Sequence, residues 1–246
     1  MRHQLTFVTS AIVLALACAS PTSPSAATTT STTTTSGASG APAWYSKFST
    51  AVTVSVEGTN VVLRSTGVPD HASPYWGAGH TLYEAPHAGM QVNPNRITTQ
   101  SIVLRVPMTP SRATASDTPM GVMGVAVNGV ALFNQYAAGR SPLTSEIISF
   151  DRFNGHPQQQ GQYHYHLEPL WLTARDGMSA LIGVLLDGYP VYGPREGDGS
   201  LPSGLDTCNG HTHTTADFAS GTYHYHVTTS VPYISGCFAG APGSIG

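Results

Sequence analysis

Two copies of the tetrapeptide Tyr-His-Tyr-His are the residues of this chain best suited to chemistry. They occupy residues 163–166 and 223–226 of a sequence with 11 histidines and only 9% charged residues. Successive side chains of a strand point to opposite faces, so both histidines of each copy share one face. Their backbones lie roughly 7 Å apart, and the rings can lean together onto one metal ion. The candidate ligands are therefore His164, His166, His224 and His226.

A third histidine accompanies each pair, because both His156 and His211 follow an Asn-Gly dipeptide. Three imidazoles from one copy would make a site with an open coordination position, whereas four from two strands would make a nearly closed tetrahedral site. The favoured prediction is one shared site to which each copy contributes half, and the three-histidine arrangement stays open as the alternative. Imidazole ligands suit copper, zinc or iron. The competing interpretation needs no metal, since the rings could simply be hydrogen-bonded on a polar sheet face.

The tyrosines of the two motifs alternate with the histidines and must face the other way. They combine a large apolar ring with a hydroxyl that needs a hydrogen-bond partner when it is buried. We expect them to enter the core behind the histidines, with their phenol groups hydrogen-bonded at its rim. These residues are Tyr163, Tyr165, Tyr223 and Tyr225.

Other polar residues are weaker candidates. Glu168, beside the first motif, has three open interpretations. It could accept a hydrogen bond from a metal-ligating histidine ring, act as a general base, or be a solvated carboxylate. Asn128 and Asp187 are expected to be turn residues, and His213 is expected to lie in a loop. We expect His71, His80 and His87 to lie at the surface or to have hydrogen-bond partners within the protein. The chain has no Gly-x-Ser-x-Gly elbow, phosphate loop, dinucleotide fingerprint or His-Glu-x-x-His motif, so the commonest enzyme classes are not indicated.

Strand patterns dominate the elements that must position these side chains. Alternating or β-branched runs are punctuated by Gly, Pro and Asn, as in "FSTAVTVSVEG" and "TTQSIVLRVPM". The stretches "GVAVNGVALFN" and "GVLLDGYPVYG" each centre on Asn-Gly or Asp-Gly, which favours a hairpin with a type I′ turn. The predicted fold is a single all-β domain, sandwich- or barrel-like, over residues 44–246.

The hairpin, the Asn-Gly-His turn and the Tyr-His-Tyr-His strand recur in the same order after about 55 to 60 residues. Two matching halves in one domain predict an internal pseudo-twofold repeat of about 60 residues. Such a repeat would bring equivalent side chains together near the axis, which is the basis for expecting one shared site.

Composition and the N-terminus indicate export. The net charge of −3 with 40% hydrophobic residues argues against a nucleic-acid partner and against a disordered acidic chain. Residues 1–17 have the basic start, short apolar run and Ala-x-Ala ending of a signal peptide. Cys18 directly after the cut also suits lipoprotein processing, so secretion and a lipid tether stay open as alternatives. Residues 18–43 are rich in Ser, Thr, Ala and Pro and predict a disordered tether.

The remaining cysteines, Cys208 and Cys237, form an even pair, which in an exported protein is most simply a disulfide. Zinc ligation by thiolates is the rival interpretation. No Cys-x-x-Cys spacing supports it.

A run of ordered motifs resembles the YHYH-domain family of exported proteins. It includes "PDHASPYWG", "FNGHPQQQGQYHYHLEP", "IGVLLDGYPVYGP", "LDTCNGH", "GTYHYHVT" and "PYISGCF". The resemblance covers most of the chain after Trp44 and implies a secreted protein or a lipoprotein. It leaves the chemistry to the residues themselves.

Three functions are consistent with these patterns. The first is an exported protein that binds copper, zinc or iron for delivery, buffering or sensing. The second is a metalloenzyme, hydrolase or oxidase, whose three histidines leave a position for water or dioxygen. The third is a metal-free surface module whose tyrosines bind a glycan or a protein partner that the sequence does not identify.

Overall fold

Both Tyr-His-Tyr-His strands lie in one eight-stranded sheet. The computed structural model describes Met1 and residues 40–246 of the chain. The sheet order is β13-β14-β12-β11-β5-β6-β10-β9. In that order its strands are β13 (Gly210–His213), β14 (Thr222–His226), β12 (Pro190–Tyr192), β11 (Leu181–Leu185), β5 (Val122–Ala126), β6 (Ala131–Phe133), β10 (Tyr163–Tyr165) and β9 (Gly155–Pro157).

The two halves of this sheet follow the same plan outward from its middle. β11 and β5 pair antiparallel at the centre, and each belongs to a hairpin whose second strand is β12 or β6. A tyrosine–histidine strand then pairs parallel to that second strand, and an antiparallel strand, β13 or β9, closes each edge. The order is compatible with the expected pseudo-twofold repeat. The repeat and the sandwich- or barrel-like shape stay predictions.

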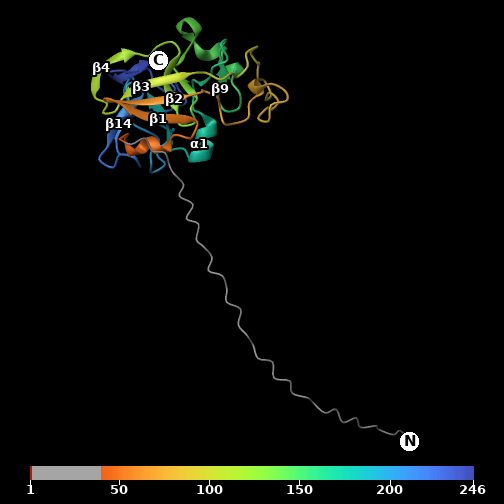
Figure 1. Cartoon of the computed structure of the whole chain (residues 1–246), viewed down its shortest axis with the longest axis horizontal. Helices are drawn as coiled ribbons and strands as arrows, with labels where there is room; N and C mark the ends of the chain where they lie inside the picture. Colours follow the sequence, from red (N-terminus) through yellow and green to blue (C-terminus); the bar gives the residue numbers. More distant parts are fainter. Residues whose placement is uncertain (2–39) are drawn as a thin grey trace. The chain divides into compact units, whose positions relative to one another are not determined.

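Three smaller sheets and several short helices complete the described part of the chain. A four-stranded sheet has the order β1-β2-β3-β16, and its first three strands lie side by side in Figure 1. Its strands are β1 (Val52–Glu57), β2 (Asn60–Ser65), β3 (Ile102–Pro107) and β16 (Ser244–Ile245). The two-stranded sheets join β15 (Cys237–Gly240) to β4 (Arg112–Asp117), and β7 (Tyr136–Ala137) to β8 (Ser141–Pro142). The helices are α1 (Leu170–Asp176) and the 3₁₀ turns Ala43–Lys47, Pro74–Trp76, Ala138–Arg140, Leu143–Ser145 and Ile147–Ser149. The all-β prediction is confirmed.

The two predicted hairpins are present, but their turn type differs from the expected one. A type I′ turn needs positive φ at both central residues, and here only the glycines, Gly129 at 90° and Gly188 at 83°, have it. The amides of Gly129 and Gly188 donate to the carbonyls of Ala126 and Leu185, as in a type I turn followed by a glycine bulge. Glycine is required because a Cβ at Gly129 would lie 2.5 Å from Ser65 Oγ on the four-stranded sheet.

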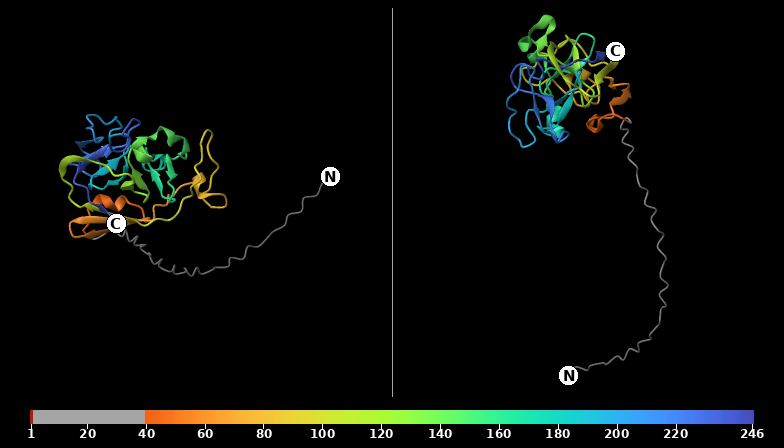
Figure 2. Two further views of the ribbon diagram at one scale, coloured as in Figure 1. Left: turned by 90° about the horizontal axis from the view of Figure 1, so that it is seen from above. Right: turned by 90° about the vertical axis from the view of Figure 1, so that its left-hand side faces the viewer.

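One hydrophobic core contains side chains of both this four-stranded sheet and the eight-stranded one. Figure 2 shows β1 and β2, in orange, along one side of the folded region, with green and blue segments across from them. Buried side chains from both sheets, among them Leu63, Leu104, Met123 and Ile182, belong to one hydrophobic cluster. All four motif tyrosines belong to it as well and are at most 5% exposed, as expected.

Cys208 and Cys237 form a disulfide, so the predicted pairing is confirmed. The bridge closes a loop of 29 residues that contains the second Tyr-His-Tyr-His strand. In the chain-entropy description such a loop closure is worth about 3 to 4 kcal/mol. We expect the double replacement of both cysteines by serine to lower the free energy of unfolding by that amount, measured by urea denaturation. A loss below about 1 kcal/mol would contradict this.

Several sequence predictions fall on residues that the structure does not describe. The predicted signal peptide at 1–17, the lipidation site Cys18 and most of the tether at 18–43 lie outside the described residues. Among the residues that are described, no helix is long and apolar enough to cross a bilayer.

Candidate metal centres

The six candidate histidines form two separate clusters of three. The first centre consists of His156, His164 and His166. The second centre consists of His211, His224 and His226 together with Glu196. Four strands, β12, β11, β5 and β6, separate β14 from β10 in the sheet. With neighbouring strands about 4.8 Å apart, the two histidine pairs cannot meet at one ion. The favoured prediction of one shared site is therefore wrong, and the arrangement matches the three-histidine alternative.

Sheet register places the three rings of the first centre together. His164 on β10 lies directly opposite His156 on β9, and His166 follows two residues later on the same face as His164. The Nε2 atoms of His164 and His166 are 2.9 Å apart. Phe133 stacks on the His164 ring, with centroids 3.9 Å apart, and Phe150 meets the edge of His156. All three histidines are at most 5% exposed.

The second centre has the same register on the opposite edge. His211 on β13 lies opposite His224 on β14, and His226 follows on the same face. The Nε2 atom of His224 is 3.0 Å from that of His226 and 3.2 Å from that of His211. Glu196 adds a carboxylate whose Oε1 is 3.2 Å from His211 Nε2 and 3.5 Å from His226 Nε2. Its side chain is only 9% exposed.

The Asn-Gly before each turn histidine is required by the local backbone. Asn154 and Asn209 have positive φ, at 65° and 71°, a conformation that asparagine tolerates better than most residues. The side-chain amide of Asn209 donates to the carbonyl of His226, at 2.7 Å, and so ties the turn to the tyrosine–histidine strand. A Cβ at Gly155 would lie 2.3 Å from the Tyr163 hydroxyl, and one at Gly210 would lie 2.4 Å from that of Tyr223.

Every ring is oriented by a hydrogen bond from its Nδ1 atom. In five rings the partner is a backbone carbonyl, which can only accept, so the proton is assigned to Nδ1. In the sixth, His156, the partner is Ser149 Oγ, whose own proton goes to the Glu146 carbonyl. The carbonyl partners of His164, His166, His224, His226 and His211 are those of Gln162, Asn134, Thr222, Gly193 and Ser203.

This assignment leaves unprotonated Nε2 atoms facing one another in each centre. Burial lowers the pKa of His156 to about 3 and that of His166 to about 4, so both rings are neutral at neutral pH. Burial likewise lowers the pKa of His224 to about 4, and lowers the pKa values of His164 and His226. Two neutral rings protonated at Nδ1 cannot hydrogen-bond through Nε2. Nitrogen lone pairs held about 3 Å apart repel one another, and a cation bound between them would remove that repulsion.

A buried nitrogen without a hydrogen-bond partner in the first centre is also consistent with a bound cation. His156 Nε2 is buried and has no hydrogen-bond partner among the described residues. Buried polar atoms without partners are rare in native proteins, and a bound ion is one accepted explanation. Two nitrogens that bind one tetrahedral ion at 2.0–2.1 Å are about 3.3 Å apart, close to the separations observed here.

Carboxylates behind the sheet fix the tyrosines that back each centre. Asp151 accepts from Tyr163 Oη at 2.7 Å, and Asp206 accepts from Tyr223 Oη at 3.0 Å. Both carboxylates also accept amides of the Asn-Gly-His turns, from Gly155 and Gly210. Each therefore locks a tyrosine to the turn that presents a candidate ligand, an outer-shell support of the kind metal sites use.

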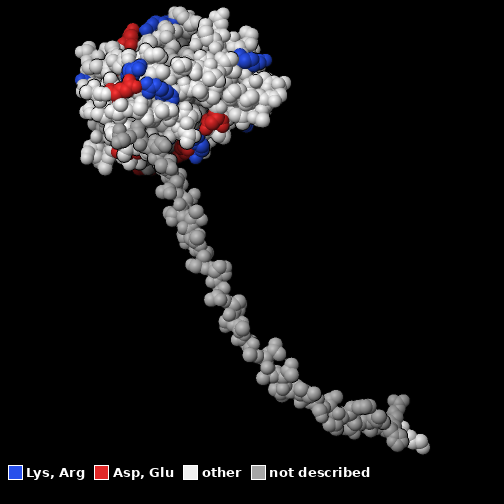
Figure 3. Space-filling model, in the orientation of Figure 1, with Lys and Arg blue, Asp and Glu red and all other residues white. Residues whose placement is uncertain are grey.

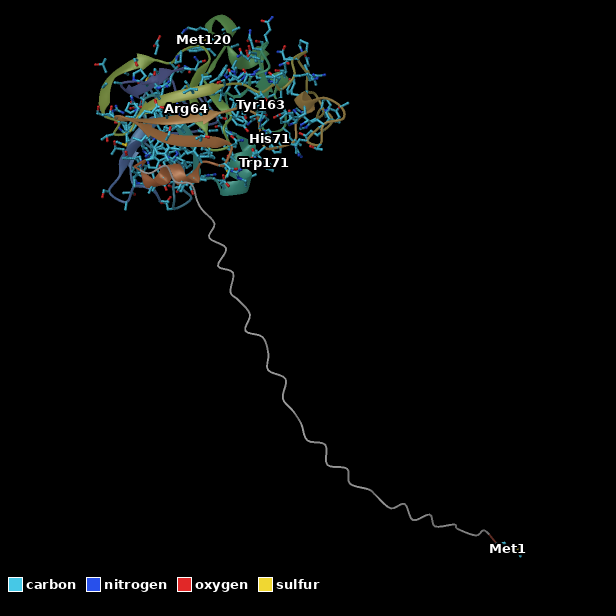
Figure 4. The ribbon with its side chains drawn as sticks, viewed as in Figure 1. Met1, Arg64, His71, Met120, Tyr163 and Trp171 are labelled. Carbon is cyan, nitrogen blue, oxygen red and sulfur yellow. A yellow bond between two sulfur atoms is a disulfide. The ribbon has the colours of Figure 1, made fainter. Side chains whose placement is uncertain are left out.

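His71 belongs to this supporting layer. Its ring is 1% exposed, and its Nε2 is 2.8 Å from Tyr165 Oη. Figure 4 shows it close to Tyr163 and Trp171, and its ring centroid is 5.6 Å from that of Tyr163. The interpretation of His71 as a satisfied histidine is consistent with these contacts.

Other residues considered from the sequence lie outside the two clusters. Glu168 accepts a hydrogen bond from Thr173 Oγ1 at 2.7 Å and is not among the clustered groups. His213 ends strand β13, so its expected place in a loop is wrong. It is half exposed, and its Nδ1 is 3.2 Å from Glu196 Oε2, beside the second centre but outside its ligand set. Asp187 is a turn residue as predicted, yet it is also buried and accepts from the Tyr225 hydroxyl and the amide of Ala239.

Sequence reasoning missed the carboxylates. Glu196 and Glu146 stand at no fixed spacing from the histidine motifs, so only the folded loops reveal them. Asp151 and Asp206 had a usable signal, because each stands five residues before its turn histidine, in "DRFNGH" and "DTCNGH". Comparing the two copies letter by letter would have found them.

The structure defines an all-β domain with a cluster of three histidines at each edge of its eight-stranded sheet. Comparison with known families identifies the family to which this domain belongs. A family model described as YHYH protein matches residues 103–201 and 196–240, more than half of the chain and all six clustered histidines. The chain belongs to this family, and the expected resemblance is confirmed. No curated protein matches the chain. No solved structure matches it.

Proposed function

We propose that the protein is an exported metal-binding protein that holds two transition-metal ions, one in each three-histidine centre. The observation that carries this proposal is the convergence of unprotonated, buried Nε2 atoms at separations of 2.9 to 3.2 Å. Imidazole and carboxylate donors suit zinc, copper or iron, and the disulfide leaves Cys208 and Cys237 without a free thiol that could compete. Delivery, buffering and sensing of such ions are the roles that this donor set serves.

Export is part of the proposal and is supported by the disulfide, since disulfides persist mainly in oxidising compartments. The surface agrees with a partner that is an ion rather than a nucleic acid. The face in Figure 3 is mostly uncharged, and Lys and Arg together number only 10 in the chain. A nucleic-acid partner would require a basic patch.

A metalloenzyme is the second candidate function, because the first centre borders a cavity of about 830 Å³. Catalytic sites commonly combine three protein ligands with an open position. The metal-free surface module has less support, since it leaves the buried His156 Nε2 without a partner.

Metal stoichiometry tests the proposal. The full-length protein, stripped with a chelator and dialysed against Zn²⁺, Cu²⁺ or anaerobic Fe²⁺, should retain two ions per chain for at least one metal, measured by elemental analysis. The matched variants His156→Ala and His211→Ala should each retain one, because each loses a ligand of a different centre. Their remaining ion reports that they are folded. Binding of no metal, or of a single ion that both variants abolish, would contradict the proposal.

A further inference from the structure

The two centres differ in whether a carboxylate joins the three histidines as a fourth candidate ligand. At the second centre the Glu196 carboxylate lies 3.2 Å from the nearest ring nitrogen, and all four groups cluster. At the first centre the nearest carboxylate, Glu146, lies 3.6 Å from His156 Nε2 and 3.9 Å from His166 Nε2, and it is not part of the cluster. The Glu146 side chain is also 30% exposed, against 9% for Glu196. The ligand set is therefore four groups in one case and three in the other.

The first centre faces the larger cavity. All three of its histidines line the hollow of about 830 Å³, a size typical of pockets that take small molecules. The second centre borders a smaller hollow of about 470 Å³, through His211 and Glu196. There the carboxylate itself is close enough to act as the fourth ligand. Only the first centre combines three ligands with room for a molecule.

The lining of the large cavity defines the chemistry of its occupant. Glu146 is the only Asp, Glu, Lys or Arg residue in that lining, so no cationic side chain would hold an anion there. The negative charge of Glu146 would offset part of the attraction that a bound metal ion exerts on an anion. The lining also includes Gln91, Gln159 and Gln160, whose side-chain amides can both donate and accept, and the apolar residues Phe133 and Ile148. Amides and apolar walls suit an uncharged molecule with hydrogen-bonding groups.

We propose that the first centre is an exchangeable coordination site that binds an uncharged, hydrogen-bonding small molecule from the cavity, whereas the second centre is closed by Glu196. This inference rests on the proposed function, because the molecule binds at the fourth position of the ion that His156, His164 and His166 hold. The Glu146 carboxylate weakens the binding of anions at that position, because it offsets part of the positive charge of the ion. The two centres then have different roles: one retains its ion, and the other presents its ion to a ligand.

Cobalt substitution tests the difference between the centres, because the visible absorption of Co²⁺ responds to a change of ligand. Full-length His211→Ala carries cobalt at the first centre, full-length His156→Ala carries it at the second, and the cobalt content of each is measured first. Imidazole, an uncharged single-donor probe, should change the spectrum of His211→Ala in a saturable way and leave that of His156→Ala unchanged. In the wild type, one of two cobalt ions should respond.

Acetate tests the selection against anions. Adding Glu146→Gln to the His211→Ala protein should strengthen acetate binding at least about 3-fold, because the repelling charge is gone, and change imidazole binding less than about 2-fold. Cobalt loading without any response at the first centre, or an equal response at both centres, would overturn this inference and leave the proposed function standing. Failure of wild-type protein and both variants to load cobalt would overturn both.

Discussion

Loading both centres with metal is expected to raise the free energy of unfolding by about 4 kcal/mol per centre when free metal exceeds its dissociation constant 1,000-fold. The fold already holds three rings of each centre with their Nδ1 atoms hydrogen-bonded and their Nε2 atoms converging, so a metal ion would bind the native state more tightly than the unfolded chain. For a domain of this size, 4 kcal/mol corresponds to a rise of roughly 8 to 16 °C in Tm.

Calorimetry of the full-length protein, chelated and then reloaded, measures this effect. His156→Ala and His211→Ala should each show about half of the wild-type metal-induced rise, since one centre remains in each. Coincident melting curves with and without metal would contradict the expected stabilisation.

Metal-free protein is expected to lose stability steeply as the pH falls from about 6.5 toward 4. The pKa of His156 is lowered to about 3 and that of His166 to about 4, both by burial. Unfolded chains bind protons at these histidines below the ordinary value of about 6.5, whereas the folded protein does not until the lowered values are reached. Each of the two residues therefore costs about 1.4 kcal/mol of stability per pH unit in that window and nothing above it.

Urea denaturation of the chelated protein at several pH values measures this slope. His156→Ala should make the slope shallower by about 1.4 kcal/mol per pH unit, because the variant has no proton to bind at that position. His80 is exposed and lies outside both centres, so His80→Ala is the matched control and should keep the wild-type slope. Equal slopes in wild type and His156→Ala would show that His156 is not held neutral by the fold.

Much of each centre was predictable because strand periodicity is local. Alternation alone places His164 and His166 on one face with Tyr163 and Tyr165 on the other, and the structure has this arrangement. The repeated Asn-Gly-His pointed to His156 and His211, which sheet register then places opposite the motif histidines. The disulfide followed from an even cysteine count.

Long-range pairing was not predictable in the same way. The order of strands in the sheet decides whether equivalent elements meet at the centre or at the edges. Here β11 and β5 lie at the centre of the sheet, and β10 and β14 lie near its opposite edges. The histidines therefore form two clusters, where one was expected. The loops that carry Glu146 and Glu196 have no periodicity, so their carboxylates could be placed only by the fold. The predicted type I′ turn of the two hairpins was wrong because only the glycine of each Asn-Gly or Asp-Gly pair has positive φ.

Anomalous diffraction from crystals of the metal-loaded full-length protein, collected at the absorption edge of the bound metal, decides whether each histidine cluster holds an ion. We expect two peaks per chain, one bound by Nε2 atoms of His156, His164 and His166 and the other by those of His211, His224 and His226, at about 2.0 to 2.1 Å. A Glu196 oxygen should complete the second site. A single peak shared by the two Tyr-His-Tyr-His strands, coordination through Nδ1 atoms, or no peak at either cluster would contradict it.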